Sequence, residues 1–143
     1  MDFLNKEATI IFERILRRLK GDSVELTNKP FYPLLIEKSV SGIETEWGKA
    51  QLYDVCLHYF NGDVMRVPEI GFAVIDKRGR KRKDYDRLKI AACYLQHDDL
   101  RKYETSVKLD GNRLIVRDPE LQKSHTHFAD HWLIDLYKMG YLD

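Results

Sequence analysis

The pattern of apolar and turn-forming residues over positions 23–117 constrains the fold more than any other feature of this sequence. Short apolar runs alternate there with Gly, Pro, Asn and Asp, which is typical of antiparallel strands joined by turns. The runs are SVELT, FYPLLIEKSV, AQLYDVCLHYF, DVMRV, IGFAVID, LKIAACYLQ, KYETSVKL and RLIVR. Because consecutive strands joined by short turns usually pair with each other, we expect a meander-like antiparallel sheet of about five to seven strands.

Specific turn chemistry marks the junctions between these runs. Asn61-Gly62 and Asp110-Gly111 each separate two runs, and such dipeptides tolerate the positive φ of a type I′ hairpin. Pro68 removes a donor from any strand ladder. We therefore expect DVMRV and IGFAVID to be two pieces of one strand broken at a bulge, or an edge strand.

An amphipathic helix is predicted at the start of the chain. Apolar residues recur there at a spacing of three and four from Leu4 to Leu19. Gly21 follows a basic last turn, which is typical of a helix end. The pattern predicts a helix over about residues 3–20.

A second helix is predicted near the other end. Asp118-Pro119-Glu120 places a capping residue, a first-turn proline and an acid in the order that begins a helix, and Gly140 follows its apolar stripe. The pattern predicts a helix over about residues 119–139. A helix followed by strands and then a second helix is the order of an α+β protein. We expect both terminal helices to pack on one face of the sheet.

The run AQLYDVCLHYF decides which face of the sheet is polar. Its apolar residues also fit helical spacing, but the Asn-Gly turn after it and its Tyr, Val and Phe content favour a strand. On a strand, the side toward the helices would carry Tyr53, Val55, Leu57 and Tyr59. The other side carries Asp54 and His58, and we expect it to face water, a partner or a ligand.

Composition restricts the class of protein further. A chain of 143 residues with 43% hydrophobic residues supports one core, so we expect a single domain over residues 1–143. A net charge of +1 gives no global attraction to nucleic acid or acidic membranes. No apolar run is long enough to span a membrane, and the first residues lack a signal-peptide pattern. With only Cys56 and Cys93, a reducing cytoplasm is the expected location.

The segment KRGRKRK is the strongest local charge feature and is expected to form a loop. Its cations are Lys77, Arg78, Arg80, Lys81, Arg82 and Lys83. Because the chain's net charge is +1, the remainder without these six cations carries −5. The loop is either a solvated connection or a weak, non-sequence-specific contact for a phosphate backbone.

Histidines and cysteines suggest a metal site or a nucleophile only in outline. His127 and His131 are four residues apart on the second predicted helix, with His125 nearby, but the HExxH arrangement is absent. Cys56 and His58 would share one strand face, yet each cysteine lies in an apolar run that keeps its thiol inert. We therefore predict no catalytic residue, no metal site and no cofactor.

Carboxylates near the Asn-Gly turn complete a candidate interaction surface. Asp63 and Glu69 flank Arg66 and are either a carboxylate pair or turn formers. Together with the polar strand face, they predict a contact surface made of Asp54, His58, Asp63, Arg66 and Glu69.

Three residue strings carry a resemblance to a known family. They are HYFNGDVMRVPEIGFAVID (58–76), YLQHDDLRKYETSV (94–107) and FADHWLIDLYKMGYL (128–142). They resemble an uncharacterised family of small bacterial proteins found on phages and conjugative elements. Val67 stands where the family pattern has Asp, and the basic loop is peculiar to this chain. The resemblance implies a one-domain accessory protein without known chemistry.

These observations favour a non-enzymatic binding or accessory module of mobile-element origin that contacts a protein partner. The first alternative is a weak nucleic-acid binder that uses the basic loop, and its affinity would fall steeply with salt. The second alternative is a metal-dependent or Cys/His-dependent hydrolase, which would require Cys56, His58 or the C-terminal histidines to converge on one pocket.

Overall fold

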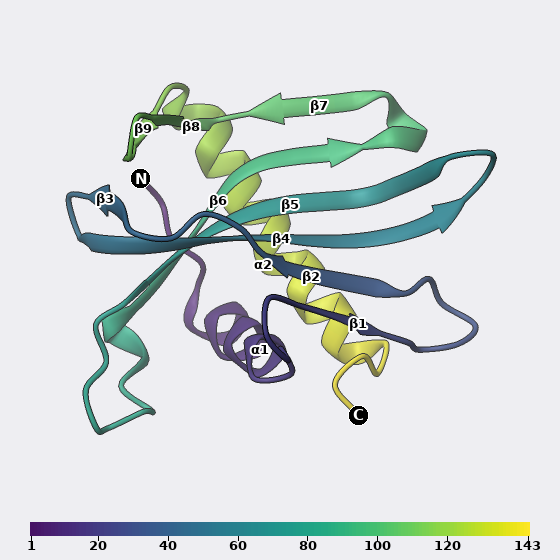
Figure 1. Cartoon of the computed structure of the whole chain (residues 1–143), viewed down its shortest axis with the longest axis horizontal. Helices are drawn as coiled ribbons and strands as arrows, with labels where there is room; N and C mark the ends of the chain where they lie inside the picture. The colour runs from purple at the N-terminus through teal and green to yellow at the C-terminus, as the bar shows by residue number, and fades with distance from the viewer.

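A sheet of nine strands and two α-helices make up the computed structural model, which describes residues 1–143 (Figure 1). The helices are α1 (Lys6–Leu16) and α2 (Pro119–Lys138). The strands are β1 (Ser23–Leu26), β2 (Leu34–Lys38), β3 (Ile43–Thr45), β4 (Gly48–Phe60), β5 (Val64–Asp76), β6 (Leu88–His97), β7 (Lys102–Thr105), β8 (Val107–Asp110) and β9 (Arg113–Val116). The α+β class predicted from the sequence is therefore confirmed.

The sheet is mixed, and it is larger than the predicted meander of five to seven strands. Strands β4, β5, β6 and β7 do form an antiparallel meander. β2 and β3 both pair with β4, and β1 pairs with β2. The chain then leaves β7 at Ser106, and β9 pairs with β3 in parallel. The prediction of a purely antiparallel meander is wrong because this late hairpin, β8–β9, joins the sheet beside a strand far from it in sequence.

The expected bulge lies at Pro68 within a single strand. Cys56 of β4 pairs with Glu69 of β5, but His58 pairs with Arg66, so two residues of β5 lie opposite one of β4. This is the geometry of a β-bulge, and it leaves the proline out of the regular ladder. Residues 51–60 are strand, so the alternative helical spacing in that run has no structural counterpart.

Both predicted hairpins form, but not with type I′ turns. Gly62 and Gly111 have φ of +75° and +62°, whereas Arg101 is the one non-glycine residue with a positive φ. A type I′ turn needs two consecutive residues with positive φ. In the first hairpin Phe60 pairs with Val64, which leaves a three-residue loop in which the glycine alone is left-handed.

The N-terminal helix is shorter than predicted, and the C-terminal helix agrees. α1 begins after Asn5, whose side chain accepts a hydrogen bond from the Ala8 N–H at 2.8 Å. It ends at Leu16, well before Gly21, which lies in a turn next to the bridge between Lys20 and Ser23. The prediction that this glycine caps the helix is wrong, because it supplies the positive φ of that turn instead.

The main core lies between the helices and the inner face of the sheet. It contains 22 buried residues, to which α1, α2 and every strand from β2 to β6 except β3 contribute. Val55 and Leu57 are in this cluster and Tyr53 packs against it, as predicted. Tyr59 departs from the prediction, because it is not part of this cluster and its ring stacks instead on Tyr32 at a centroid distance of 5.0 Å.

A second, smaller core lies on the opposite, outer face of the same strands. Six buried residues form it: Ile43, Ala50, Ala73, Ile75, Cys93 and Val107. Alternate residues of β5 enter the two clusters, as the period of two in a strand requires. β3 and β8 contribute Ile43 and Val107 to this cluster, and β9 pairs with both strands at one end of the sheet (Figure 1). The rest of the outer face remains open. Neither α1 nor α2 combines the length and apolar character needed to cross a membrane.

Candidate functional site

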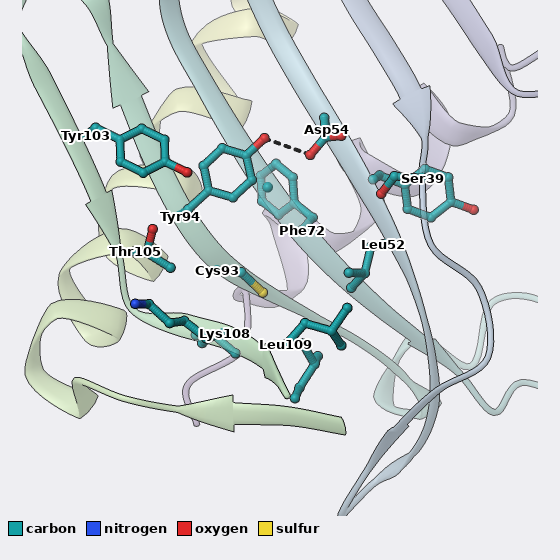
Figure 2. Close-up of a pocket in the computed structure, with 14 residues that line it drawn as sticks. Ser39, Leu52, Asp54, Phe72, Cys93, Tyr94, Tyr103, Thr105, Lys108 and Leu109 are labelled. Carbon is teal, nitrogen blue, oxygen red and sulfur yellow. Dashed lines mark hydrogen bonds between the residues drawn. The ribbon is translucent and has the colours of Figure 1, made fainter. Parts of the chain in front are cut away.

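A pocket of about 440 Å³ opens on the outer face, between the central strands and the β7–β8 segment (Figure 2). Strands β4 and β6 supply Asp54 and Tyr94, and β7 supplies Tyr103. β8 supplies Lys108 and Leu109. Nine of its 14 lining residues are hydrophobic, so it combines apolar walls with a small number of polar groups. That combination is typical of sites that bind organic groups.

Tyr94 joins two carboxylates at the edge of the pocket. Its hydroxyl lies 2.7 Å from Asp54 Oδ1 and 3.1 Å from Glu69 Oε2. Its ring lies over Gly71, where an added Cβ would be 1.9 Å from Tyr94 Cε2. The missing side chain at Gly71 is therefore what lets the tyrosine lie flat on the sheet and reach both carboxylates.

Burial is the main cause of the raised pKa values of Glu69 and Tyr94. Desolvation raises the pKa of Glu69, although the Tyr94 hydroxyl and Arg66 act in the opposite direction. Burial and the two neighbouring carboxylates raise the pKa of Tyr94 above its usual range. The phenol therefore keeps its proton, and this single hydrogen serves one carboxylate at a time.

The structure brings together part of the predicted interaction surface. Arg66 Nε lies 3.7 Å from Glu69 Oε1, so Asp54, Arg66 and Glu69 form one group around Tyr94. His58 lies on the same face of β4, but its Nε2 is 3.1 Å from Glu25 Oε1 on β1.

Asp63 is separate from this group. It is exposed in the hairpin loop, where its carboxylate accepts a hydrogen bond from the N–H of Val64 at 2.8 Å. Of the two roles that the sequence left open for it, the structure shows the turn-forming one.

Two of the six cations in the basic loop have structural partners. Arg78, whose side chain is 5% exposed, binds Asp76 at 2.9 Å and lies 3.8 Å from Glu13 of α1. Arg82 lies 3.3 Å from Asp76. The hydrogen bond from Arg78 is the main cause that lowers the pKa of Asp76. The loop is therefore not uniformly solvated, because Arg78 contacts Glu13 of α1. The remaining cations, which are exposed and form no salt bridge, are Lys77, Arg80, Lys81 and Lys83.

The candidate metal ligands and nucleophiles do not converge. No group of three His, Cys, Asp or Glu side chains has the geometry to hold a metal ion. His127 and His131 are exposed and contact each other, whereas His125 is buried. Burial raises the pKa of both Cys56 and Cys93 to about 12, which makes their thiols poor nucleophiles. The geometry that a hydrolase built from these groups would require is not present.

His125 has a structural environment that the sequence did not reveal. Its Nδ1 lies 2.8 Å from the hydroxyl of Ser106, and its Nε2 lies 3.2 Å from Glu104. The Ser106 hydroxyl also lies 3.1 Å from the carbonyl oxygen of Cys93, so its single hydrogen serves either that carbonyl or Nδ1. The three residues resemble a catalytic triad in composition, but the serine is fully buried and so cannot meet a substrate. The group instead connects α2 to the crossing between β7 and β8.

One family model matches nearly the whole chain. The model of the family "Domain of unknown function (DUF6908)" matches residues 7–142. The chain belongs to this family. No curated protein and no solved structure matched it. The DUF6908 match spans nearly the whole chain and contains the sheet, α2 and all of α1 except its first residue, Lys6.

Proposed function

We propose that this chain is a non-enzymatic accessory module that binds a protein partner on the outer face of its sheet. The open pocket beside Asp54 is the observation that carries the proposal. Aromatic and aliphatic walls, a few fixed polar groups and a rigid floor of central strands are the features of a preformed binding site. Tyr94 holds the polar groups in place through hydrogen bonds to Asp54 and Glu69.

The surroundings of the pocket support a protein as the bound partner. Tyr103 is 68% exposed and Leu109 is 41% exposed, and both line the pocket. Exposed aromatic side chains that surround a concave site are common anchors of protein interfaces. We also propose a mobile-element origin, for which the resemblance of three residue strings is the support, and a role in the cytoplasm, for which the two free cysteines are the support.

Photo-crosslinking from the rim of the pocket tests this function. A photoreactive phenylalanine analogue replaces Tyr103 in one variant and Phe128, an exposed residue of α2, in the control. In cells of the organism that encodes the chain, we expect a specific protein adduct from position 103 only. Equal adducts from both positions, or no protein adduct at all, would contradict the proposal.

A nucleic-acid contact is the second candidate, and the exposed cations without salt bridges favour it. We expect such binding to weaken as salt increases, because each phosphate contact releases counterions. Fluorescence anisotropy with a labelled duplex would measure the slope for wild type and for the variant Lys77→Ala/Arg80→Ala/Lys81→Ala/Lys83→Ala. Equal affinity for both would exclude this loop as the contact.

A further inference from the structure

We propose that the outer pocket receives an arginine side chain of the partner, with Asp54 as its carboxylate and Tyr94 and Tyr103 as its aromatic walls. This inference rests on the proposed function and names the chemical group that the site takes. Three features of the pocket favour an arginine: its unpaired charge, the arrangement of its rings and its apolar floor.

The charge around Asp54 is not compensated within the chain. Asp54 is half-buried and forms no salt bridge, and the carboxylate of its cross-strand neighbour on β2, Glu37, also has none. Glu69 has Arg66 at 3.7 Å, so that cation already has an acceptor. Asp54 accepts a hydrogen bond from Tyr94 but has no cation, so a positively charged guest would add a charge-assisted pair at this carboxylate.

Lys108 does not supply the missing cation. It is exposed on β8, and Figure 2 shows its nitrogen beside Thr105, across the pocket from Asp54. Its alkyl stem lines the wall while the ammonium group reaches solvent, as long basic side chains usually do. The carboxylate therefore remains available to a guest.

The two tyrosine rings favour a guanidinium over other cations. The centroids of Tyr94 and Tyr103 are 6.3 Å apart, and their planes are tilted by 33°. A planar guanidinium stacks on aromatic faces, pairs with carboxylates and is less strongly hydrated than an ammonium. The transfer of a guanidinium from water into this half-buried, aromatic site therefore costs less free energy than the transfer of an ammonium group.

The floor of the pocket has room for more than the charged group. Leu52, Leu109 and Leu114 contribute apolar surface, and a volume of about 440 Å³ lies within the range of sites that hold small organic ligands. The guest is therefore best described as an arginine next to an apolar residue of the partner.

A titration with short peptides tests the inference directly. The probes are acetyl-Leu-Arg-amide, its neutral citrulline counterpart and its lysine counterpart, each followed by amide chemical shifts of the labelled protein. We expect the arginine peptide to shift the amides of β4, β6 and β8 and to bind about tenfold more tightly than the citrulline peptide. Equal binding of the arginine and citrulline peptides would overturn the inference, and equal binding of the lysine peptide would overturn the choice of arginine.

Two substitutions locate the effect, and each has a matched control. Asp54→Asn keeps an acceptor for Tyr94 but removes the charge, and Tyr103→Leu removes one ring at an exposed position. Each is expected to abolish the preference for arginine over citrulline, whereas Glu46→Gln and Phe60→Leu, at exposed positions elsewhere, retain it. Retained preference in Asp54→Asn would contradict the assignment.

The peptide titration and the crosslinking experiment can each fail independently of the other. If position 103 yields a protein adduct while the peptides show no charge preference, the binding face stands and the arginine assignment fails. If the peptides bind as expected but no adduct forms, the pocket recognises arginine and the proposed partner interaction fails.

Discussion

Gly71 determines how closely Tyr94 approaches the sheet. An added Cβ would overlap the tyrosine ring, since the nearest ring atom would be 1.9 Å away. Gly71→Ala should therefore displace Tyr94, break its contacts with Asp54 and Glu69, and lower the free energy of unfolding by about 1–3 kcal/mol. Urea denaturation measures the change. In a Gly71→Ala/Tyr94→Ala double variant the two losses should not add, and simple additivity would contradict this account.

The polar residues on β4 could be predicted from the sequence, whereas Tyr94 could not. Alternation along one strand was sufficient to place Asp54 on the open face. On β6, however, the register shifts beside Gly71, so that Ala92 pairs with Phe72 and Tyr94 pairs with Gly71. This extra residue, Cys93, turns Tyr94 to the outer face. A bulge of this kind inside an apolar run leaves no turn residue to reveal it.

The basic loop is an element whose cations have different roles. Arg78 is nearly buried and binds Asp76, whereas Lys81 is exposed and has no carboxylate partner. Arg78→Ala should therefore lower the free energy of unfolding by about 2 kcal/mol, because a hydrogen-bonded charge loses its partner. Lys81→Ala should change it by less than about 0.5 kcal/mol. Chemical denaturation of both variants checks the difference, and equal losses would contradict it.

The group around His125 makes stability depend on pH. Burial lowers the pKa of His125 below its ordinary 6.5, although Glu104 and Asp118 raise it and Lys102 lowers it. As the pH falls below 6.5, the unfolded chain takes up a proton that the folded chain does not, so the free energy of unfolding decreases. The raised pKa of Glu69 acts in the opposite direction above its ordinary 4.5.

A variant separates these contributions. His125→Gln lacks the titrating group, so the stability advantage of the wild type over this variant should shrink between pH 7 and pH 5. Urea midpoints at several pH values measure that advantage. A constant difference across the range would contradict a neutral, buried imidazole.

Local signals predicted the elements themselves better than their ends or their packing. Asp118 marked the beginning of α2 correctly because the capping geometry is local. Gly21 was misassigned because a positive φ serves a tight turn as well as a helix end. The position of β8–β9 depends on contacts with β3, such as the pairing of Glu44 with Arg113, which no local pattern encodes.

The two clusters should unfold together, because both are built on β4, β5 and β6. The two tryptophans report on them separately: Trp132 belongs to the larger cluster and Trp47 packs against the smaller one. Trp47→Phe and Trp132→Phe each leave a single tryptophan, whose emission is followed. We expect the fluorescence midpoint of each variant to coincide with its own midpoint by circular dichroism, as in a two-state transition. Separate midpoints within one variant would show that the clusters are independent.

The overall class was accessible from the sequence, but the second core was not recognised. The apolar stripes of the two terminal helices predict that both pack on one face of the sheet. The run IGFAVI, residues 70–75, is buried throughout, and such a continuous apolar run is typical of a strand covered on both faces. The run begins two residues after Pro68, where the proline indicates a broken strand more strongly than the run indicates a second core.

The dependence of the main core on α2 has a consequence for how the protein is made. Ala129, Leu133 and Leu136 of α2 belong to that core, as does Leu142, which follows the helix. The ribosome releases them only after the strands they cover have emerged. Until then α1 is the only helix available to shield the inner face, and the nascent chain exposes an apolar sheet. Translation speed and chaperone supply should therefore affect the yield of this protein more than that of one whose core closes early.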